Sequence, residues 1–277
     1  MQDVLFVLGA ADPEMQAIEA LLAAHAVSHV RATVDGKRVY PANAYKAELP
    51  SAAEAVLERG GRVYLVECVA KAAPGTLRID HHMPGHPGYG RPPAEFWQAS
   101  SLGQTVAALQ DGAEIEVEVT PTMRLTAAAD HCLGAAYRGE CPGIDPEALM
   151  RWHVAARAAY EKRPEAALLK DIATARQTLR DAAQVELAPG IFAADVRARF
   201  VPELLLAAAR DSQCCLSSVK ARDGRTKIGC LVGSPAQVSA FMHEWAPAHH
   251  LVDVYGDSMR GFAGAYQVGD TAALAPA

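Results

Sequence analysis

The sequence has little that would draw it to a polyanion or a membrane. Its 26 Lys and Arg are outnumbered by 32 Asp and Glu, giving a net charge of -6, and aromatic residues make up only 6% of the chain. Without a basic excess, charge alone does not attract a protein to long duplex nucleic acid or anionic lipid. No apolar run approaches the roughly 18 residues of a membrane-spanning helix. We therefore expect neither partner.

The sequence also lacks the marks of export and of a disulfide framework. The segment Met1 to Gly9 has no basic n-region and is too short for the apolar core of a signal peptide. No two cysteines form a C-x-x-C pair, so reduced, buried thiols are the simplest expectation. The six are Cys68, Cys132, Cys141, Cys214, Cys215 and Cys230. We expect a cytoplasmic protein.

What is present is an ordinary globular composition, with 51% apolar and 21% charged residues in a chain of 277. That length suits one large domain or two modest ones. Strand-like and helix-like patterns alternate through the first two-thirds of the chain. We expect strands over 4–8, 28–34, 62–66 and 77–79, and a strand or hairpin piece over 115–119. Helices are expected over 13–24, 51–58, 96–110, from 121 onward, 146–162 and 165–183. This alternation predicts an α/β domain with a largely parallel sheet and helices on both faces.

The helical pattern stops near residue 185. The tail then shows four strand patterns around one helical pattern, an order that predicts a smaller α+β domain. The strands are expected over 214–219, 227–232, 251–255 and 263–267, and the helix over 235–245. We place the division near residue 185, giving domains 1–185 and 186–277.

Acidic and histidine residues follow the predicted strands. Asp12 and Glu14 come after the first strand, Glu67 ends a later one, and Asp80-His81-His82 follow the short strand over 77–79. In a parallel sheet these groups would meet at the carboxyl ends of the strands. Their mutual repulsion calls for a cation, and a mixed carboxylate and imidazole set suits Mn²⁺ or Mg²⁺.

Some of these residues also have a plain structural explanation. Asp12 before Pro13 is suited to cap a helix, and Glu14 is favourable in its first turn. Capping does not prevent an aspartate from binding a metal. Ser100 and Ser101 open another predicted helix, where hydroxyls and free amides suit an anion.

The stretch Ile79-Asp80-His81-His82, followed by Pro87 and by Ala99-Ser100-Ser101, resembles the third motif of the DHH phosphoesterase superfamily. Asp12-Pro13-Glu14 is similar to that family's D-x-D first motif. Glu67 stands at the place of its second acidic motif, and Asp130 in Ala127 to His131 at that of its fourth. The two-domain plan also agrees with the family.

The resemblance implies a two-domain hydrolase that holds a pair of divalent metals, usually Mn²⁺, between which a water attacks phosphorus. Asp80, His81 and His82 become the candidate catalytic residues, with His82 a general acid or phosphate-facing group. The implied metal ligands are Asp12, Glu14, Glu67, Asp80, His81 and Asp130. The substrates would be phosphodiesters or phosphoanhydrides of small nucleotides or short oligonucleotides.

The chain departs from the family pattern in three respects. No His precedes Asp12, two usual Asp positions carry Glu, and Arg260 to Gly264 lacks the His of the last motif. The longer Glu side chain shifts the ligand oxygens, so one ion rather than two remains an alternative. His86 and His131 are candidate replacement ligands.

The C-terminal part offers two candidate phosphate-binding patches. Arg222 and Arg225 flank the turn Asp223-Gly224 together with Lys220 and Lys227, which is either a solvated hairpin tip or a substrate patch. Arg260 and the amides of Gly261 to Gly264 form the second candidate.

Three functions follow from these observations. The first is a metal-dependent phosphoesterase acting on a small phosphorylated substrate or short oligonucleotide. The second is a degenerate relative that binds a nucleotide or metal without hydrolysis. The third is an unrelated α/β metal hydrolase with a non-phosphate substrate. Ala-rich helical faces are compatible with a homodimer.

Overall fold

The structure, a computed structural model, describes residues 3–69, 71, 73–221 and 224–267. The predicted substrate residue Arg222 therefore lies outside the described residues. The chain forms two compact units, Met1–His131 and Cys132–Ala277.

The first unit is built on a parallel sheet with the strand order β2-β1-β5-β6. The strands are β1 (Val4–Leu8), β2 (His29–Arg31), β5 (Arg62–Val66) and β6 (Thr76–Ile79). Two short antiparallel strands, β3 (Thr33–Val34) and β4 (Lys37–Arg38), pair only with each other. The expected strand over 28–34 is thus divided between β2 and β3.

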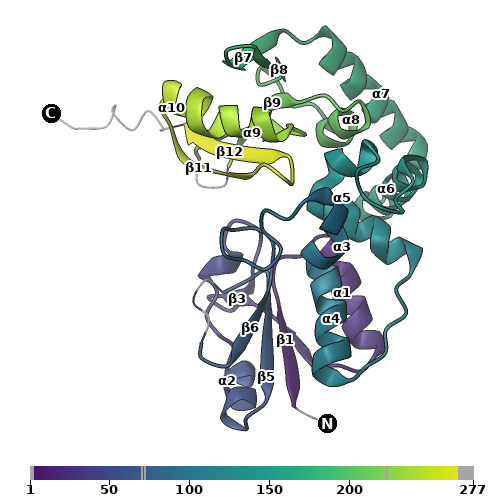
Figure 1. Ribbon diagram of the computed structural model, residues 1–277, viewed down its shortest axis with the longest axis vertical. Helices are drawn as coiled ribbons and strands as arrows, with labels where there is room; N and C mark the ends of the chain where they lie inside the picture. The colour runs from purple at the N-terminus through teal and green to yellow at the C-terminus, as the bar shows by residue number, and fades with distance from the viewer. Residues whose placement is uncertain (1–2, 70, 72, 222–223, 268–277) are drawn as a thin grey trace, which may run out of the picture. The chain divides into compact units, whose positions relative to one another are not determined.

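Helices cover both faces of this sheet. Helices α1 (Pro13–Ala24) and α4 (Ser101–Ala113) lie side by side on one face (Figure 1), where their apolar residues pack against alternate residues of β1 and β5. Helix α2 (Ser51–Glu58) packs against the opposite residues of the same strands. The predicted α/β class, parallel sheet and two-sided helical covering are confirmed for this unit.

Several short elements complete the unit. They are η1 (Ala44–Lys46), η2 (Pro93–Glu95) and α3 (Phe96–Ala99), followed by α5 (Pro121–Tyr137). The single helix expected over 96–110 is two helices, because Ser100 adopts an extended conformation and its hydroxyl accepts a hydrogen bond from Gly103 N–H at 3.0 Å. The α5 segment is also interrupted, since Cys132 has non-helical backbone angles where the two units divide.

The prediction of a strand over 115–119 is wrong, because these residues are extended but belong to no sheet of the described chain. Their alternation has another cause. Ile115, Val117 and Val119 pack into the core formed by α1, α4 and the sheet. Burial of every second side chain produces a strand-like pattern without a neighbouring strand.

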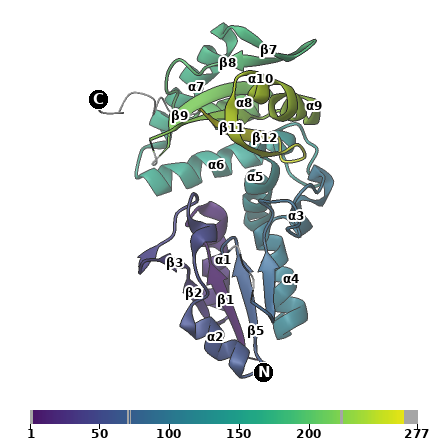
Figure 2. The ribbon, with the colours of Figure 1, turned by 90° about the vertical axis from the view of Figure 1, so that its left-hand side faces the viewer.

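The second unit has a six-stranded sheet with the order β11-β12-β10-β9-β8-β7, in which only β8 and β9 run parallel. Its strands are β7 (Gln184–Ala188), β8 (Ile191–Asp195), β9 (Cys215–Lys220), β10 (Thr226–Leu231), β11 (Leu251–Asp257) and β12 (Phe262–Gln267). The helices that accompany them are α6 (Pro146–Glu161), α7 (Glu165–Asp181), α8 (Leu204–Arg210), α9 (Pro235–Ala240), η3 (Phe241–Trp245) and α10 (Ala246–Ala248). In Figures 1 and 2, α9 and α10 accompany β11 and β12, where Val238, Phe241 and Trp245 join the core of this sheet.

The sequence pattern did not indicate β7, β8 or α8, and it predicted a division near residue 185. The structure groups α6 and α7 with the C-terminal sheet instead, so the units divide after His131. The ion pair of Arg176 with Asp211 and that of Arg157 with Glu203 join these two helices to the segment around α8. This part of the chain is therefore a mixed α/β unit larger than expected.

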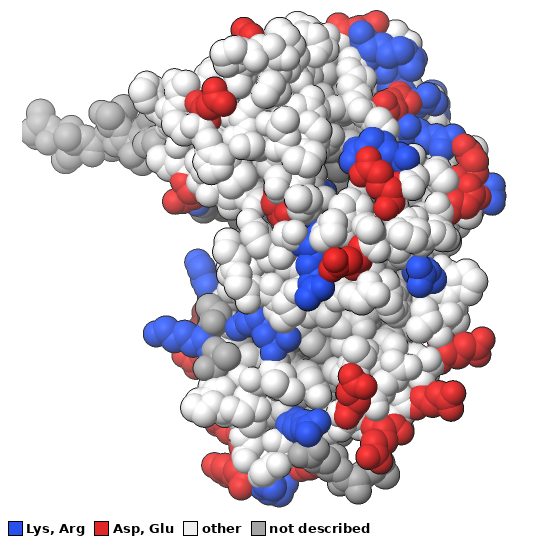
Figure 3. All heavy atoms as spheres, viewed as in Figure 1, with Lys and Arg blue, Asp and Glu red and all other residues white. Residues whose placement is uncertain are grey.

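No helix in the described part of the chain is long and apolar enough to cross a membrane. On the face shown in Figure 3, acidic and basic side chains are interspersed over the α6–α7 side of the second unit. Several of them form ion pairs, such as that of Arg163 with Asp171. This side presents mixed charge rather than a continuous basic track.

Candidate metal centre

The carboxyl ends of the parallel strands bring the predicted acidic residues together. Glu67 directly follows β5, and His81 lies two residues after β6. Asp12 caps α1, which begins just after β1, by accepting a hydrogen bond from Met15 N–H at 2.7 Å. Because neighbouring parallel strands end at one edge of the sheet, side chains distant in sequence share one site.

Four of these side chains offer ligand atoms that all lie within 4.8 Å of one another: Glu14, Glu67, His81 and Asp130. His81 is fully buried, and its Nε2 atom lies 3.1 Å from Asp130 Oδ2 and 3.4 Å from Glu67 Oε1. We call these four residues, a candidate metal-binding cluster, the metal centre. Three carboxylates and one imidazole are a donor set suited to a hard divalent cation.

Glu14 gives the strongest sign that a cation belongs there. Its side chain is 1% exposed, and its Oε1 accepts a hydrogen bond from Leu102 N–H at 3.1 Å, but its buried Oε2 makes no hydrogen bond with any described residue. Burial, and then the charges of Asp130 and Glu67, raise the pKa of Glu14 well above its ordinary value. Such an atom is costly to bury without a partner, and a cation would provide one.

Glu67 is fixed by an unusual backbone and by a serine. Its φ of 50° lies in the left-handed region, which is rare for a side chain of this kind. Ser101 Oγ donates to Glu67 Oε1 at 2.7 Å. Gly9 makes room for this turn, since a Cβ on it would lie 2.5 Å from the Glu67 carbonyl oxygen.

Asp12 lies beside the centre rather than within the four-residue group. Burial, followed by the nearby Asp130 and Glu67 charges, raises the pKa of Asp12 to about 8. A second, overlapping group joins Glu67, His81 and His82. Both groups share Glu67 and His81, so in the described residues they are two possible ligand sets at one site.

Asp80 lies outside the four-residue group. Neither group of close ligand atoms in the described chain contains it. Tyr45 Oη donates to both of its oxygens, at 3.1 and 3.0 Å, while the Nδ1 atoms of His82 and His86 lie 3.1 and 3.0 Å from Oδ1. Arg78 lies 3.6 Å away. Asp80 thus holds two imidazoles at their Nδ1 atoms, and its role as a metal ligand stays a prediction.

Tyr45 and Arg78 are members of this cluster that the sequence pattern did not indicate. Tyr45 comes from the short η1 segment, where no periodic pattern marks it. Arg78 stands within β6 and also donates to the carbonyl oxygens of Cys68 and Val69. A charged residue directly before Ile79 in a short strand is the sequence signal that could have indicated Arg78.

The predicted substrate residues have different surroundings. Ser100 and Ser101 are both fully buried; Ser100 caps α4 and Ser101 supports Glu67. These hydroxyls therefore already have partners inside the fold.

The remaining predicted substrate residues that the structure describes belong to the second unit. Arg225 pairs with Asp253 at 2.6 Å and lies over the Tyr266 ring, and Arg260 lies over Phe262. Gly261 has a φ of 77°, and Gly264 lies against the Tyr255 ring. These contacts leave their predicted phosphate-binding role untested.

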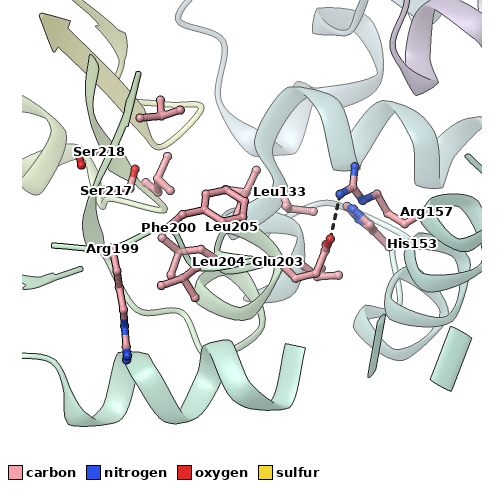
Figure 4. Close-up of a pocket in the computed structure, with 14 residues that line it drawn as sticks. Leu133, His153, Arg157, Arg199, Phe200, Glu203, Leu204, Leu205, Ser217 and Ser218 are labelled. Carbon is pink, nitrogen blue, oxygen red and sulfur yellow. Dashed lines mark hydrogen bonds and ion pairs between the residues drawn. The ribbon is translucent and has the colours of Figure 1, made fainter. Parts of the chain in front are cut away.

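A pocket of about 370 Å³ in the second unit contains none of the predicted site residues (Figure 4). Arg157 and Glu203 form an ion pair at one side, near His153, while Ser217 and Ser218 lie at the opposite side. Burial, and then Arg157, lowers the pKa of His153 to about 4, so its imidazole is uncharged near neutrality. This pocket lacks the acidic cluster that distinguishes the metal centre.

Comparison with known proteins adds no assignment. No protein-family model matches the chain, and no curated protein matches its sequence significantly.

Proposed function

We propose that this protein is a divalent-metal-dependent phosphoesterase similar to the DHH phosphoesterases. It would hydrolyse a phosphodiester or phosphoanhydride in a small nucleotide or short oligonucleotide. The observation that supports this best is the convergence of Glu14, Glu67, His81 and Asp130, including a buried Glu14 oxygen without a hydrogen-bond partner. Residues from four separate segments would not gather so much like charge without a counter-ion.

The four residues of the metal centre would hold Mn²⁺ or Mg²⁺, with Asp12 beside them for a second ion. When bound, the ion supplies a Lewis acid that lowers the pKa of water and stabilises charge on a phosphoryl group. Ser101 keeps the Glu67 carboxylate in place through its 2.7 Å hydrogen bond. The surrounding core excludes water from Glu14, which is buried under the start of α4.

His82 is the candidate proton donor. Asp80 Oδ1 lies 3.1 Å from its Nδ1 atom, and 35% of the His82 side chain is exposed. With Nδ1–H held by Asp80, Nε2 would take up a proton from solvent to give the imidazolium, and the imidazolium would then donate that proton to the leaving oxygen. Asp80 thus acts through His82, by fixing the orientation of its ring.

The substrate is proposed to be small. An acidic chain with interspersed surface charge on the side seen in Figure 3 suits a nucleotide or short oligonucleotide better than a long duplex. Arg225, Arg260 and the Gly261–Gly264 backbone remain the proposed phosphate contacts. A cytoplasmic location and a homodimer belong to the same proposal.

The experiment is hydrolysis of bis-p-nitrophenyl phosphate across a Mn²⁺ titration, with Mn²⁺ binding measured by calorimetry. The wild type should bind Mn²⁺ and turn over the ester. Glu14→Gln should lose both, because it removes a buried ligand charge. Glu54→Gln is the matched control, since Glu54 lies in the first turn of another helix, α2, as Glu14 does in α1, but is exposed. Absence of both binding and turnover in the wild type would refute the proposal.

A second candidate is a related protein that binds metal or nucleotide without hydrolysis. It is favoured by the absence of a His before Asp12 and by the overlap of the two ligand groups, which share Glu67 and His81. Tight Mn²⁺ binding without turnover of the generic ester or of nucleotides at any Mn²⁺ concentration would support this candidate over the first.

A further inference from the structure

Both ring nitrogens of His81 lie close to other side chains. Its Nε2 edge faces Glu67 and Asp130, as described above, while its Nδ1 atom lies 3.1 Å from Nδ1 of His131. The two rings are stacked, with centroids 5.2 Å apart and planes 29° from parallel. His131 is 1% exposed, so this contact is shielded from water.

The far side of His131 determines where its proton lies. Its Nε2 atom is 3.4 Å from the carbonyl oxygen of Arg91. A carbonyl oxygen can only accept, so Nε2 of His131 must carry a hydrogen. In a neutral ring, Nδ1 of His131 then has a lone pair and accepts a hydrogen bond.

The proton arrangement of His81 follows. Two nitrogen atoms 3.1 Å apart form a hydrogen bond only if one of them carries the hydrogen. Since Nδ1 of His131 is the acceptor, Nδ1 of His81 is the donor. Nε2 is then the nitrogen of His81 that faces the carboxylates of Glu67 and Asp130, and it would give its lone pair to a cation bound there.

We propose that His131 is a positioning residue that holds His81 in the Nδ1–H tautomer, so that Nε2 is the metal-binding atom. The sequence pattern made His131 a candidate replacement ligand; in this proposal it acts through His81 instead. The inference deepens the proposed function, on which it rests for the presence of a cation. The hydrogen-bond order itself does not depend on hydrolysis.

Charge explains why an imidazole would serve here. Metal-binding histidines commonly donate their other N–H to a carboxylate, a carbonyl or water. A carboxylate at the position of His131 would add another buried negative charge to Glu14, Glu67 and Asp130. A neutral imidazole fixes the orientation of His81 without that cost.

The first test is a long-range ¹H–¹⁵N spectrum of the histidine side chains in the metal-free wild type. We expect a protonated Nδ1 on His81, and on His131 a protonated Nε2 with an unprotonated Nδ1. An unprotonated Nδ1 on His81, or a protonated Nδ1 on His131, would overturn the inference. This measurement needs no variant and no turnover.

The second test is Mn²⁺ affinity, measured from the free-ion resonance in electron paramagnetic spectra. His131→Leu should weaken binding about 10- to 100-fold. His131→Gln should stay near the wild type, because its amide can accept from His81 and donate to Arg91. His153→Leu is the control for losing a partly buried histidine outside the centre. Equal affinity of His131→Leu and the wild type would contradict the inference.

The two proposals fail in different ways. A wild type that binds no Mn²⁺ would remove the proposed function, while the histidine spectrum would still judge the hydrogen-bond order. A wild type that binds Mn²⁺ with the opposite tautomer would leave the metal centre in place and overturn the role of His131.

Discussion

Asp12 both caps α1 and faces the carboxylates of the metal centre. Its Oδ1 atom accepts from Met15 N–H, and its pKa is raised from 3.8 to about 8 by burial and by Asp130 and Glu67. A carboxyl group with a raised pKa favours the folded state at low pH. This contribution is fully present below the ordinary pKa and is lost as the pH rises through the folded-state value.

We therefore expect the ionisation of Asp12 to lower the melting temperature of the metal-free wild type as the pH rises from about 4 to about 8. Asp12→Asn should reduce this fall, because asparagine keeps the helix cap but does not ionise. The fall should not vanish, since Glu14 titrates in the same direction. Thermal unfolding followed by circular dichroism in EDTA measures it.

The control is Asp145→Asn, which changes an exposed helix cap on α6 that accepts hydrogen bonds from Glu147 and Ala148 N–H. It should leave the pH dependence unchanged. Identical pH profiles for the wild type and Asp12→Asn would show that Asp12 is ionised normally in the folded protein.

At the level of residues, sequence patterns located groups but not their partners. Glu67 and Asp130 could be selected because acidic residues follow a buried strand or interrupt an apolar helix. The bond of Ser101 to Glu67 and that of Tyr45 to Asp80 could not be predicted, since each joins segments 34 or 35 residues apart. Those pairings depend on how helices and loops meet at the edge of the sheet.

The segment between β6 and α4 is the element that carries His81, His82 and His86. It is folded closely on itself at Gly88, where a Cβ would lie 2.0 Å from the Ala99 carbonyl oxygen and 2.7 Å from the His81 Cβ. The absence of a side chain at this residue therefore lets the segment pass directly beneath His81.

Gly88→Ala should destabilise the protein by about 1–3 kcal/mol, the usual cost of overpacking, and weaken Mn²⁺ binding by displacing His81. Gly85→Ala is the comparison within the same segment: φ is 86° there, but a Cβ would have open space. It should cost about 1–2 kcal/mol through backbone strain alone and leave Mn²⁺ affinity intact. Urea unfolding and calorimetry distinguish the two, and equal Mn²⁺ affinities would contradict the expected displacement.

Helices and strands with strong local signals were predictable, and those governed by distant packing were not. Helix α1 has Asp12 as its cap and Pro13 at its start, and it begins where expected. The strands β7 and β8 were missed because they extend directly from the long α7 pattern. Their burial depends on the sheet that β9 and β10 complete.

At the scale of the whole molecule, the division after His131 has a direct consequence for truncation. Helix α7 buries Leu168, Ile172, Ala175 and Leu179. Because α6 and α7 belong to the second unit, a fragment spanning 132–277 retains its helices, while one spanning 186–277 loses them.

The longer fragment should unfold cooperatively and give dispersed amide resonances, and the shorter one should not. Removing the helices would expose the apolar surface that they cover, at a free-energy cost of about 25 cal/mol per Å². The remaining sheet does not offset that cost. Denaturant titration and two-dimensional amide spectra provide the comparison. A cooperatively folded 186–277 fragment would restore the boundary that the sequence pattern indicated.

The buried carboxylates of the metal centre also bear on the life of the protein in a cell. A ligand that binds only the folded state lowers the population of open forms in proportion to its occupancy. If the centre takes a divalent ion, a shortage of that ion would raise the fraction of chains open to proteases. Abundance would then follow metal supply, through turnover of the chain rather than its synthesis.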